Sequence, residues 1–126
     1  MRMESDLFEY LMGSVSGTLD TMSPISWKDK SAVCIVLASK GYPESYTKGD
    51  EIFGLEQVFD DGFVFHAGTK RQDKKIVTSG GRVLSVTGLG DTLESAINHA
   101  YNITEKISWE NKYLRTDIGK KGLSHL

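Results

Sequence analysis

The segment Ser79-Gly80-Gly81-Arg82 contains the residues of this chain best suited to hold an anion. Two consecutive glycines leave their backbone N–H groups uncovered and a guanidinium follows directly, so the segment could bind a phosphate or a carboxylate. The alternative is a plain hairpin turn with its arginine in solvent, and the segment alone does not decide between them. Gly80, Gly81 and Arg82 are therefore candidates to contact an anion.

A second polar pair, His66 and Thr69, ends a β-rich run earlier in the chain. A lone histidine is more often a hydrogen-bonded structural residue than a catalyst. No second histidine or cysteine stands at ligand spacing, so a zinc site is not expected. From the residues alone, His66 is therefore interpreted as a structural residue at the end of a strand.

The sequence contains no pattern that supplies a catalytic centre. No nucleophile has a neighbouring base, and the acidic pairs at 50–51 and 60–61 stand in turn-like or strand-edge contexts, not beside a phosphate-binding loop as magnesium would need. Gly-Leu-Gly-Asp-Thr at 88–92 departs from a dinucleotide fingerprint, because Leu93 replaces the third glycine and Asp91 puts a negative charge where pyrophosphate would lie. We expect a turn and helix cap there, and no catalytic, cofactor-binding or metal-binding residue.

The composition is typical of a single globular domain. The chain has 126 residues, 39% of them hydrophobic and 25% charged, and a net charge of −2, which favours neither nucleic acid nor an anionic membrane as a partner. Its one cysteine, Cys34, lies in an apolar run and is expected to be a small core residue in a reducing compartment. With no secretory signal and no membrane-length apolar stretch, the expected location is the cytoplasm.

Apolar periodicity predicts two helices. One follows Asp6, with Glu9 at capping-box spacing, and ends between Gly13 and Gly17. The other follows Asp91 as N-cap and carries an apolar face suited to packing on a sheet.

Strands are expected at 32–38, 63–67, 75–78 and 82–87. The first is a continuous apolar run, typical of a strand covered on both faces. The glycine pair at 80–81 is expected to join the last two strands as a hairpin, and the charged segment 70–75 to form a solvated hairpin tip. The fold class is α+β: a small, mostly antiparallel sheet or barrel flanked by an N-terminal and a C-terminal helix.

Several motifs together resemble one family. They are LASKGYP at 37–43 with Tyr46, Lys48 and Gly49, HAGT at 66–69, TSGGRVL at 78–84, GDTL at 90–93 and YLRTDIG at 113–119. This succession is similar to the C-terminal portion of glycinamide ribonucleotide synthetase, also called phosphoribosylamine–glycine ligase, of the ATP-grasp superfamily. RMESDL at 2–7 resembles the stretch that leads from the ATP-grasp domain into the C-terminal domain. Lys40 departs from the small residue common at its position.

The resemblance implies that residues 1–20 end an ATP-grasp domain and 21–126 form the C-terminal domain. It implies a step of purine biosynthesis: ATP phosphorylates glycine, and the amine of 5-phosphoribosylamine attacks the acyl phosphate, while Mg²⁺ or Mn²⁺ neutralises phosphate charge. The family's Asp-Pro-Glu metal motif and glycine-rich ATP lid lie upstream, so no ATP or metal is expected on this chain, which alone should be inactive. The expected partners are glycine, 5-phosphoribosylamine and the remainder of the same ligase chain. In the wall of the substrate site, the resemblance makes Gly80, Gly81 and Arg82 the first candidate contacts, followed by His66 and Thr69 and then by Tyr42 and Lys48.

A second hypothesis is a stand-alone binding or assembly module without catalysis, which the lack of metal ligands and nucleophile also allows. Under the first hypothesis, Leu7, Phe8 and Leu11 would lack the upstream surface on which they pack in the whole enzyme, leaving an exposed apolar patch.

Overall fold

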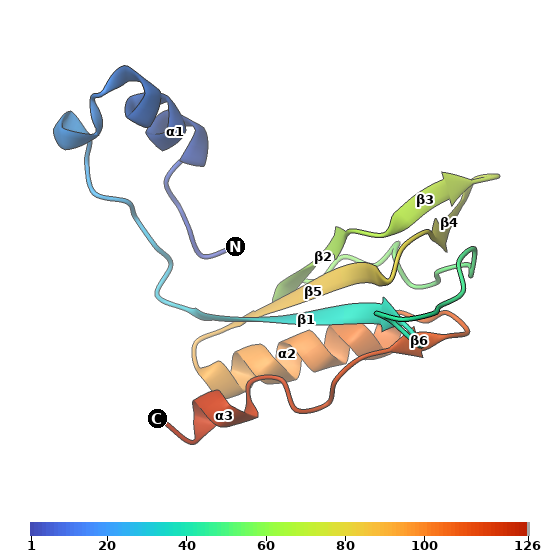
Figure 1. The fold of residues 1–126 in the computed structure, drawn as a ribbon. Helices are drawn as coiled ribbons and strands as arrows, with labels where there is room; N and C mark the ends of the chain where they lie inside the picture. The colour runs from blue at the N-terminus through green and yellow to red at the C-terminus, as the bar shows by residue number, and fades with distance from the viewer. Residues whose placement is uncertain (126) are drawn as a thin grey trace.

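The computed structural model describes residues 1–125. One helix lies against one face of a four-stranded antiparallel sheet, and an N-terminal arm rises from the body (Figure 1). The elements are α1 (Leu7–Ser16), η1 (Leu19–Thr21), β1 (Ser31–Ser39), β2 (Gly62–His66), β3 (Thr69–Gln72), β4 (Lys75–Thr78), β5 (Arg82–Gly90), α2 (Leu93–Lys106), β6 (Lys112–Tyr113) and α3 (Lys120–Leu123). The sheet order is β2-β5-β1-β6, with β3 and β4 forming a separate two-stranded sheet. The α+β expectation is confirmed; both sheets are open, so no barrel closes.

The core lies between the sheet and α2. Ile35 and Leu37 of β1 stand opposite Val86 and Leu84 of β5, and all four are fully buried. Because neighbouring residues of a strand point to opposite faces, Cys34 lies on the other face of β1, where it is exposed. The expectation of a strand covered on both faces, with Cys34 in the core, is therefore wrong for this chain: α2 covers one face only.

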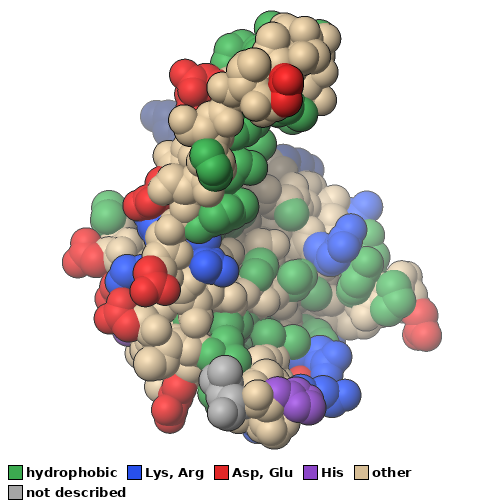
Figure 2. Space-filling view, turned by 90° about the vertical axis from the view of Figure 1, so that its left-hand side faces the viewer, with side chains coloured by type: hydrophobic (Ala, Val, Ile, Leu, Met, Phe, Trp, Pro, Cys, Tyr) green, Lys and Arg blue, Asp and Glu red, His purple; other side chains and the backbone are tan. Residues whose placement is uncertain are grey.

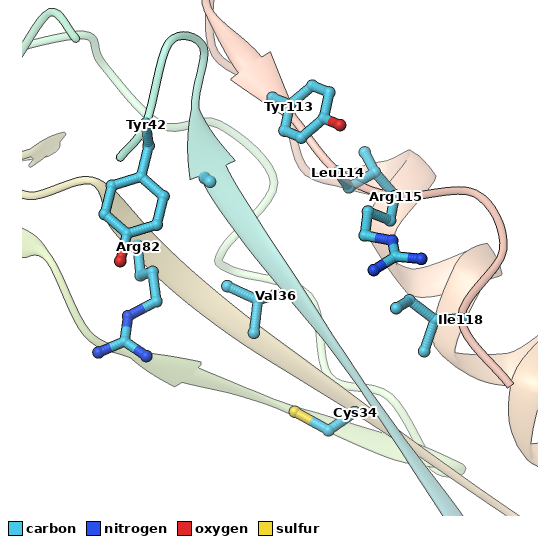
Figure 3. A pocket seen from close by; sticks show the side chains of 9 residues that line it. Cys34, Val36, Tyr42, Arg82, Tyr113, Leu114, Arg115 and Ile118 are labelled. Atoms are coloured by element: carbon cyan, nitrogen blue, oxygen red, sulfur yellow. The ribbon is translucent and has the colours of Figure 1, made fainter. Parts of the chain in front are cut away.

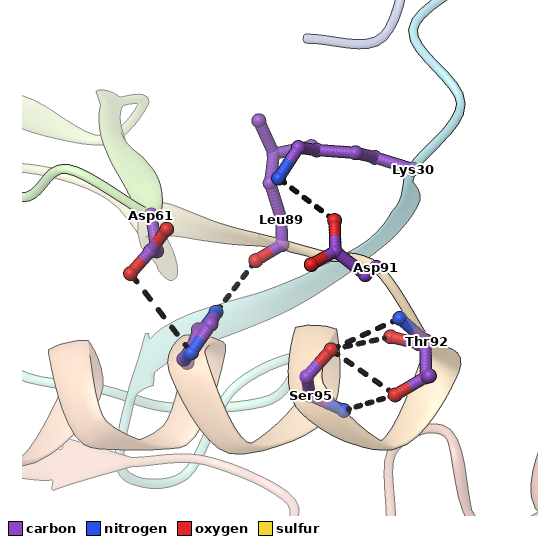
Figure 4. Close-up of polar contacts among 7 residues, drawn as sticks. Lys30, Asp61, Leu89, Asp91, Thr92 and Ser95 are labelled. Carbon is purple, nitrogen blue, oxygen red and sulfur yellow. Dashed lines mark hydrogen bonds and ion pairs between the residues drawn. The ribbon is translucent and has the colours of Figure 1, made fainter.

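The helix α2 begins one residue later than expected. Its N-cap is Thr92, whose Oγ1 accepts from the backbone N–H of Ser95, while Ser95 Oγ accepts from the N–H of Thr92, both at 3.1 Å (Figure 4). Asp91 is not the cap; it forms an ion pair with Lys30 at 3.0 Å. A serine hydroxyl at the N3 position closes a capping box as a glutamate would, and this pairing explains the shift.

The glycines before α2 allow the helix to lie close to β5. A Cβ on Gly88 would overlap the backbone N of Ala100 and O of Ala96, and a Cβ on Gly90 would overlap the backbone of Ser95 and Ala96. The Gly-Leu-Gly segment is thus the end of strand β5 and serves packing, so the turn expected there is wrong, while the expected helix cap follows at Thr92.

The expected hairpin between β4 and β5 is wrong. β4 pairs with β3, and the tip of that hairpin is Asp73-Lys74, with φ of 47° and 69°. Two consecutive residues of positive φ give the twist that matches paired strands. Gly80 and Gly81 do not have positive φ; their segment instead carries the chain from the small sheet to the large one.

Residues 1–30 form the arm, with α1 at its far end (Figure 1). Asp6 caps α1 by accepting from the N–H of Phe8 at 2.9 Å, and the helix ends at Gly17, which has φ of 68°. The main packing contacts of α1 are with η1. Its apolar side chains stay exposed, as the sequence led us to expect for Leu7, Phe8 and Leu11.

Candidate functional site

Three loops meet at one end of the large sheet: the segment after β1, the connection from β2 to β3, and the connection from β4 to β5. The carbonyl oxygen of Gly68 accepts from the N–H groups of Ser79 at 2.7 Å and Gly80 at 3.2 Å. The N–H of Ser39 donates to the carbonyl of Gly81 at 2.8 Å. Backbone hydrogen bonds therefore hold the three loops together.

The two glycines at 80–81 are packed closely by their neighbours. The Cα of Gly80 would lie 2.7 Å from a Cβ built on Gly68, and a Cβ on Gly81 would overlap the ring of Tyr42. The N–H of Gly80 already donates to Gly68. The guanidinium of Arg82 is the charged group of this segment.

An irregularity in the pairing of β1 with β5 determines the face of the sheet to which Arg82 points. Leu37 pairs with Leu84, but the next residue, Ala38, pairs with Arg82, so Val83 is an extra residue on β5. A bulge of this kind changes the face to which a side chain points. It turns Arg82 to the face of the sheet opposite α2, while Val83 is fully buried.

A cavity of about 290 Å³ lies beside Arg82 on this face. Its floor is apolar, from Cys34, Val36 and Ala38. Tyr42 and Arg82 stand on one side of β1, and Leu114, Arg115 and Ile118 on the other (Figure 3).

The two arginines of the cavity differ in their partners. Arg115 donates to both carboxylate oxygens of Asp117, Nε to Oδ1 at 2.9 Å and Nη2 to Oδ2 at 2.6 Å. The hydrogen bond from Arg115 holds the pKa of Asp117 below its ordinary value. Arg82 has no ion pair and no side-chain hydrogen bond within residues 1–125. It is the guanidinium that remains available to a ligand.

His66 and Thr69 lie together but apart from Arg82. His66 Nδ1 is 2.9 Å from Thr69 Oγ1. His66 stands opposite Leu84, and paired residues of an antiparallel sheet share a face, so its side chain is on the α2 side. Gly80, Gly81 and Arg82 are thus brought together, whereas His66 and Thr69 form a separate exposed pair.

The loop after β1 places aromatic side chains next to the cavity. Tyr42 and Tyr46 meet edge to face at 5.9 Å, and Lys48 Nζ lies 5.6 Å from the centre of the Tyr46 ring. Tyr113 and Arg115 also line the cavity, although sequence reasoning did not include them among the site residues. Tyr113 arrives there through β6, a two-residue strand that shows no periodicity in the sequence.

Metal sites and membrane-spanning helices were also sought in the described part of the chain. Within residues 1–125, no group of three His, Cys, Asp or Glu side chains is placed to hold a metal ion. No helix in the same range has the length and apolar character needed to cross a bilayer.

Over residues 1–125, three α-helices, two antiparallel sheets and a cavity lined by two arginines define a small α+β domain. Comparison with protein families matches residues 32–121 to "Phosphoribosylglycinamide synthetase, C domain". The chain belongs to this family.

Relatives of known name agree with the family. The chain is 48% identical over 116 residues to the phosphoribosylamine–glycine ligase of Caldanaerobacter subterraneus subsp. tengcongensis, covering 92% of this chain and 27% of that protein. It is 48% identical over 118 residues to the ligase of Synechocystis, covering 93% and 28%.

A solved structure agrees as well. The crystal structure of phosphoribosylamine–glycine ligase from Thermotoga maritima matches with a TM-score of 0.69 at 38% identity, over 87% of this chain and 27% of that one. The chain spans less than a third of the length of each of these three relatives.

Proposed function

We propose that this chain is the C-terminal domain of a phosphoribosylamine–glycine ligase and forms part of the wall of its substrate site. The reaction would be the ATP-dependent joining of glycine to 5-phosphoribosylamine, a step of purine biosynthesis in the cytoplasm. In this proposal residues 1–20 end the ATP-grasp domain and 21–126 form the C-terminal domain. The support is the family, together with the names of relatives of which the chain covers about 27–28%.

At the level of residues, the proposal rests on Arg82. It is charged, stands at the cavity on the uncovered side of the sheet, and has no partner of its own within residues 1–125. A guanidinium can bind the ribose phosphate of one substrate or the carboxylate of the other through two parallel hydrogen bonds. Gly80 and Gly81 would hold Arg82 and Tyr42 in place, and His66 with Thr69 would contact substrate from the sheet edge.

ATP and its metal are assigned to the upstream part of the ligase. For the metal, this assignment is supported by the acidic side chains of residues 1–125, which do not converge in a metal-binding group. The chain therefore contributes positioning and charge, and no step of phosphoryl transfer is placed on it.

The test is a chimeric ligase in which this chain takes the place of the matching 116 residues of the Caldanaerobacter enzyme. Loss of a hydrogen-bonded charge costs about 1.5–3 kcal/mol, so Arg82→Ala should lower kcat/KM for phosphoribosylamine or glycine by about 10- to 100-fold. Arg82→Lys keeps the charge without the planar fork and should recover part of the loss.

Arg71→Ala is the matched control, because Arg71 is an exposed arginine in β3 and lines none of the site. It should leave kcat/KM unchanged. An Arg82→Ala enzyme with unaltered kcat/KM for both substrates would remove Arg82 from the site. A chimera that folds but has no activity would favour the stand-alone module.

A further inference from the structure

The face of the sheet opposite α2 is apolar and uncovered. By the strand register, three rows of side chains share it: Phe63, Thr87 and Cys34; Phe65, Ser85 and Val36; Arg82, Ala38 and Tyr113. Its large apolar members are exposed by 58% (Phe63), 45% (Phe65), 41% (Val36) and 54% (Tyr113), and the two phenylalanine rings stack at 6.2 Å. We call these four residues with Cys34 the open face.

The arm adds a second uncovered apolar surface. Leu7, Leu11 and Val15 follow one another at helical spacing on α1, and all three are more than half exposed. Figure 2 shows hydrophobic side chains along the arm, which rises clear of the body. A soluble protein rarely leaves apolar surfaces of this extent to water unless they meet a partner.

Both surfaces lie on the same side of the molecule. In Figure 1, α2 lies below the sheet, and the arm with α1 rises above it, on the side of the open face. In that view the N-terminus is drawn between α1 and the sheet. A single body seated beside α1 could therefore cover both.

We propose that the open face is an interface that receives the upstream part of the ligase chain, the part to which α1 itself belongs in the proposed function. This rests on the proposed function. The length of the relatives identifies the occupant: the chain covers 27% and 28% of two ligases, which leaves more than two thirds of each to be packed against this domain. Permanent interfaces are the more hydrophobic ones, which suits a covalently joined neighbour.

Cys34 provides a built-in reporter, because it is the only cysteine of the chain and belongs to the open face. Labelling with iodoacetamide, followed by mass spectrometry of the Cys34 peptide, would be timed in the isolated chain and in the chimeric ligase. We expect labelling of Cys34 at least tenfold slower in the chimera. A Gln72→Cys variant on the exposed β3 is the matched control and should label equally fast in both.

A substitution on the same face tests the contact independently. Phe63→Asp, at an exposed position, should leave the melting temperature of the isolated chain within a few degrees of the parent but restore fast Cys34 labelling in the chimera. Lys70→Glu, on β3, is the control: it should also leave the melting temperature within a few degrees of the parent, but Cys34 should stay slow to label in the chimera.

Two results would overturn the interface: Cys34 labelling at the same rate in both proteins, or protection only in the concentrated isolated chain, with a dimer in sedimentation, which would assign the face to a second copy. Activity of the chimera separates the two proposals. An active chimera with reactive Cys34 overturns the interface alone, whereas an inactive chimera with protected Cys34 overturns the proposed function alone.

Discussion

Lys112 connects the strand β6 to the end of α2. Its Nζ donates to the carbonyl oxygens of Thr104 at 2.9 Å and Ile107 at 2.5 Å. The last carbonyls of a helix have no partner within the helix and carry its negative dipole end, so an ammonium there is doubly favourable. Burial nevertheless lowers the pKa of Lys112 from its ordinary value, with the charge of Glu105 opposing the shift.

Replacing Lys112 should reveal both effects. Lys112→Met removes the donor to the carbonyl of Ile107 and one of the two donors to that of Thr104, which keeps the N–H of Ile107, and should lower the free energy of unfolding at pH 7 by about 1–2 kcal/mol. With a lowered pKa in the folded state, the native protein binds fewer protons than the unfolded chain just below pH 10.5, so this group's contribution rises with pH in that window.

Urea unfolding of parent and variant at pH 7, 9 and 10 measures this contribution. The difference in unfolding free energy between them should grow from pH 7 to pH 10. Lys70→Met, on the exposed hairpin, is the control, and its difference from the parent should stay flat. A Lys112→Met difference that also stays flat would contradict the linkage.

At the scale of elements, the contact between α2 and β5 depends on glycine. A Cβ at position 88 would overlap backbone atoms of α2, and backbone cannot move aside as a side chain can. Gly88→Ala should therefore lower the free energy of unfolding by about 1–3 kcal/mol, the usual range for an overpacked core.

Thermal unfolding followed by circular dichroism measures this cost. Gly17→Ser is the comparison, since nothing lies within 4 Å of a Cβ there and the penalty comes from its φ of 68° alone. Gly88→Ala should lower the melting temperature further than Gly17→Ser. A Gly88→Ala protein as stable as its parent would show that α2 can shift away from β5.

The sequence allowed the elements to be predicted better than their pairing. The long helix was evident because apolar residues recur on one side of it, and its cap lay one residue away. The hairpin tip expected at 70–75 is confirmed at Asp73-Lys74. The pairing of β4 was nevertheless predicted wrongly, because the Gly-Gly pair is a common hairpin signal and was interpreted as joining β4 to β5. The apolar run of β1 wrongly predicted a strand covered on both faces, because Cys34 and Val36 are apolar yet exposed.

The candidate site was predictable in its residues but not in its geometry. Arg82 stood out by type and by the glycines before it, yet its face depends on one extra residue in β5. The separation of His66 from Arg82 follows from the same register. Tyr113 and Arg115 escaped notice because a two-residue strand brings them to the cavity.

At the scale of the whole molecule, the arm and the body are nearly independent. Within the arm, the N–H of Glu4 donates to the carbonyl of Ser26 at 2.9 Å and the N–H of Lys28 to that of Arg2 at 2.8 Å. Removal of residues 1–28 takes away both sides of these bonds while keeping Lys30, which pairs with Asp91.

We expect the shortened chain to unfold cooperatively within a few degrees of the full chain in calorimetry, because its core is intact. Removal of residues 107–126 is the contrasting truncation: it takes away Ile107 and Trp109, both buried, and should abolish cooperative unfolding. If loss of the arm instead unfolds the body, the arm is part of the stabilising core.

The extra residue at Val83 also bears on how this chain should be aligned with others. Because side chains alternate along a strand, deletion of one residue between positions 82 and 84 would restore even pairing and send the arginine to the α2 side of the sheet. An arginine found after a glycine pair in another sequence corresponds to Arg82 only if the spacing to the next core leucine is the same. In this short stretch, the residue count matters as much as residue identity.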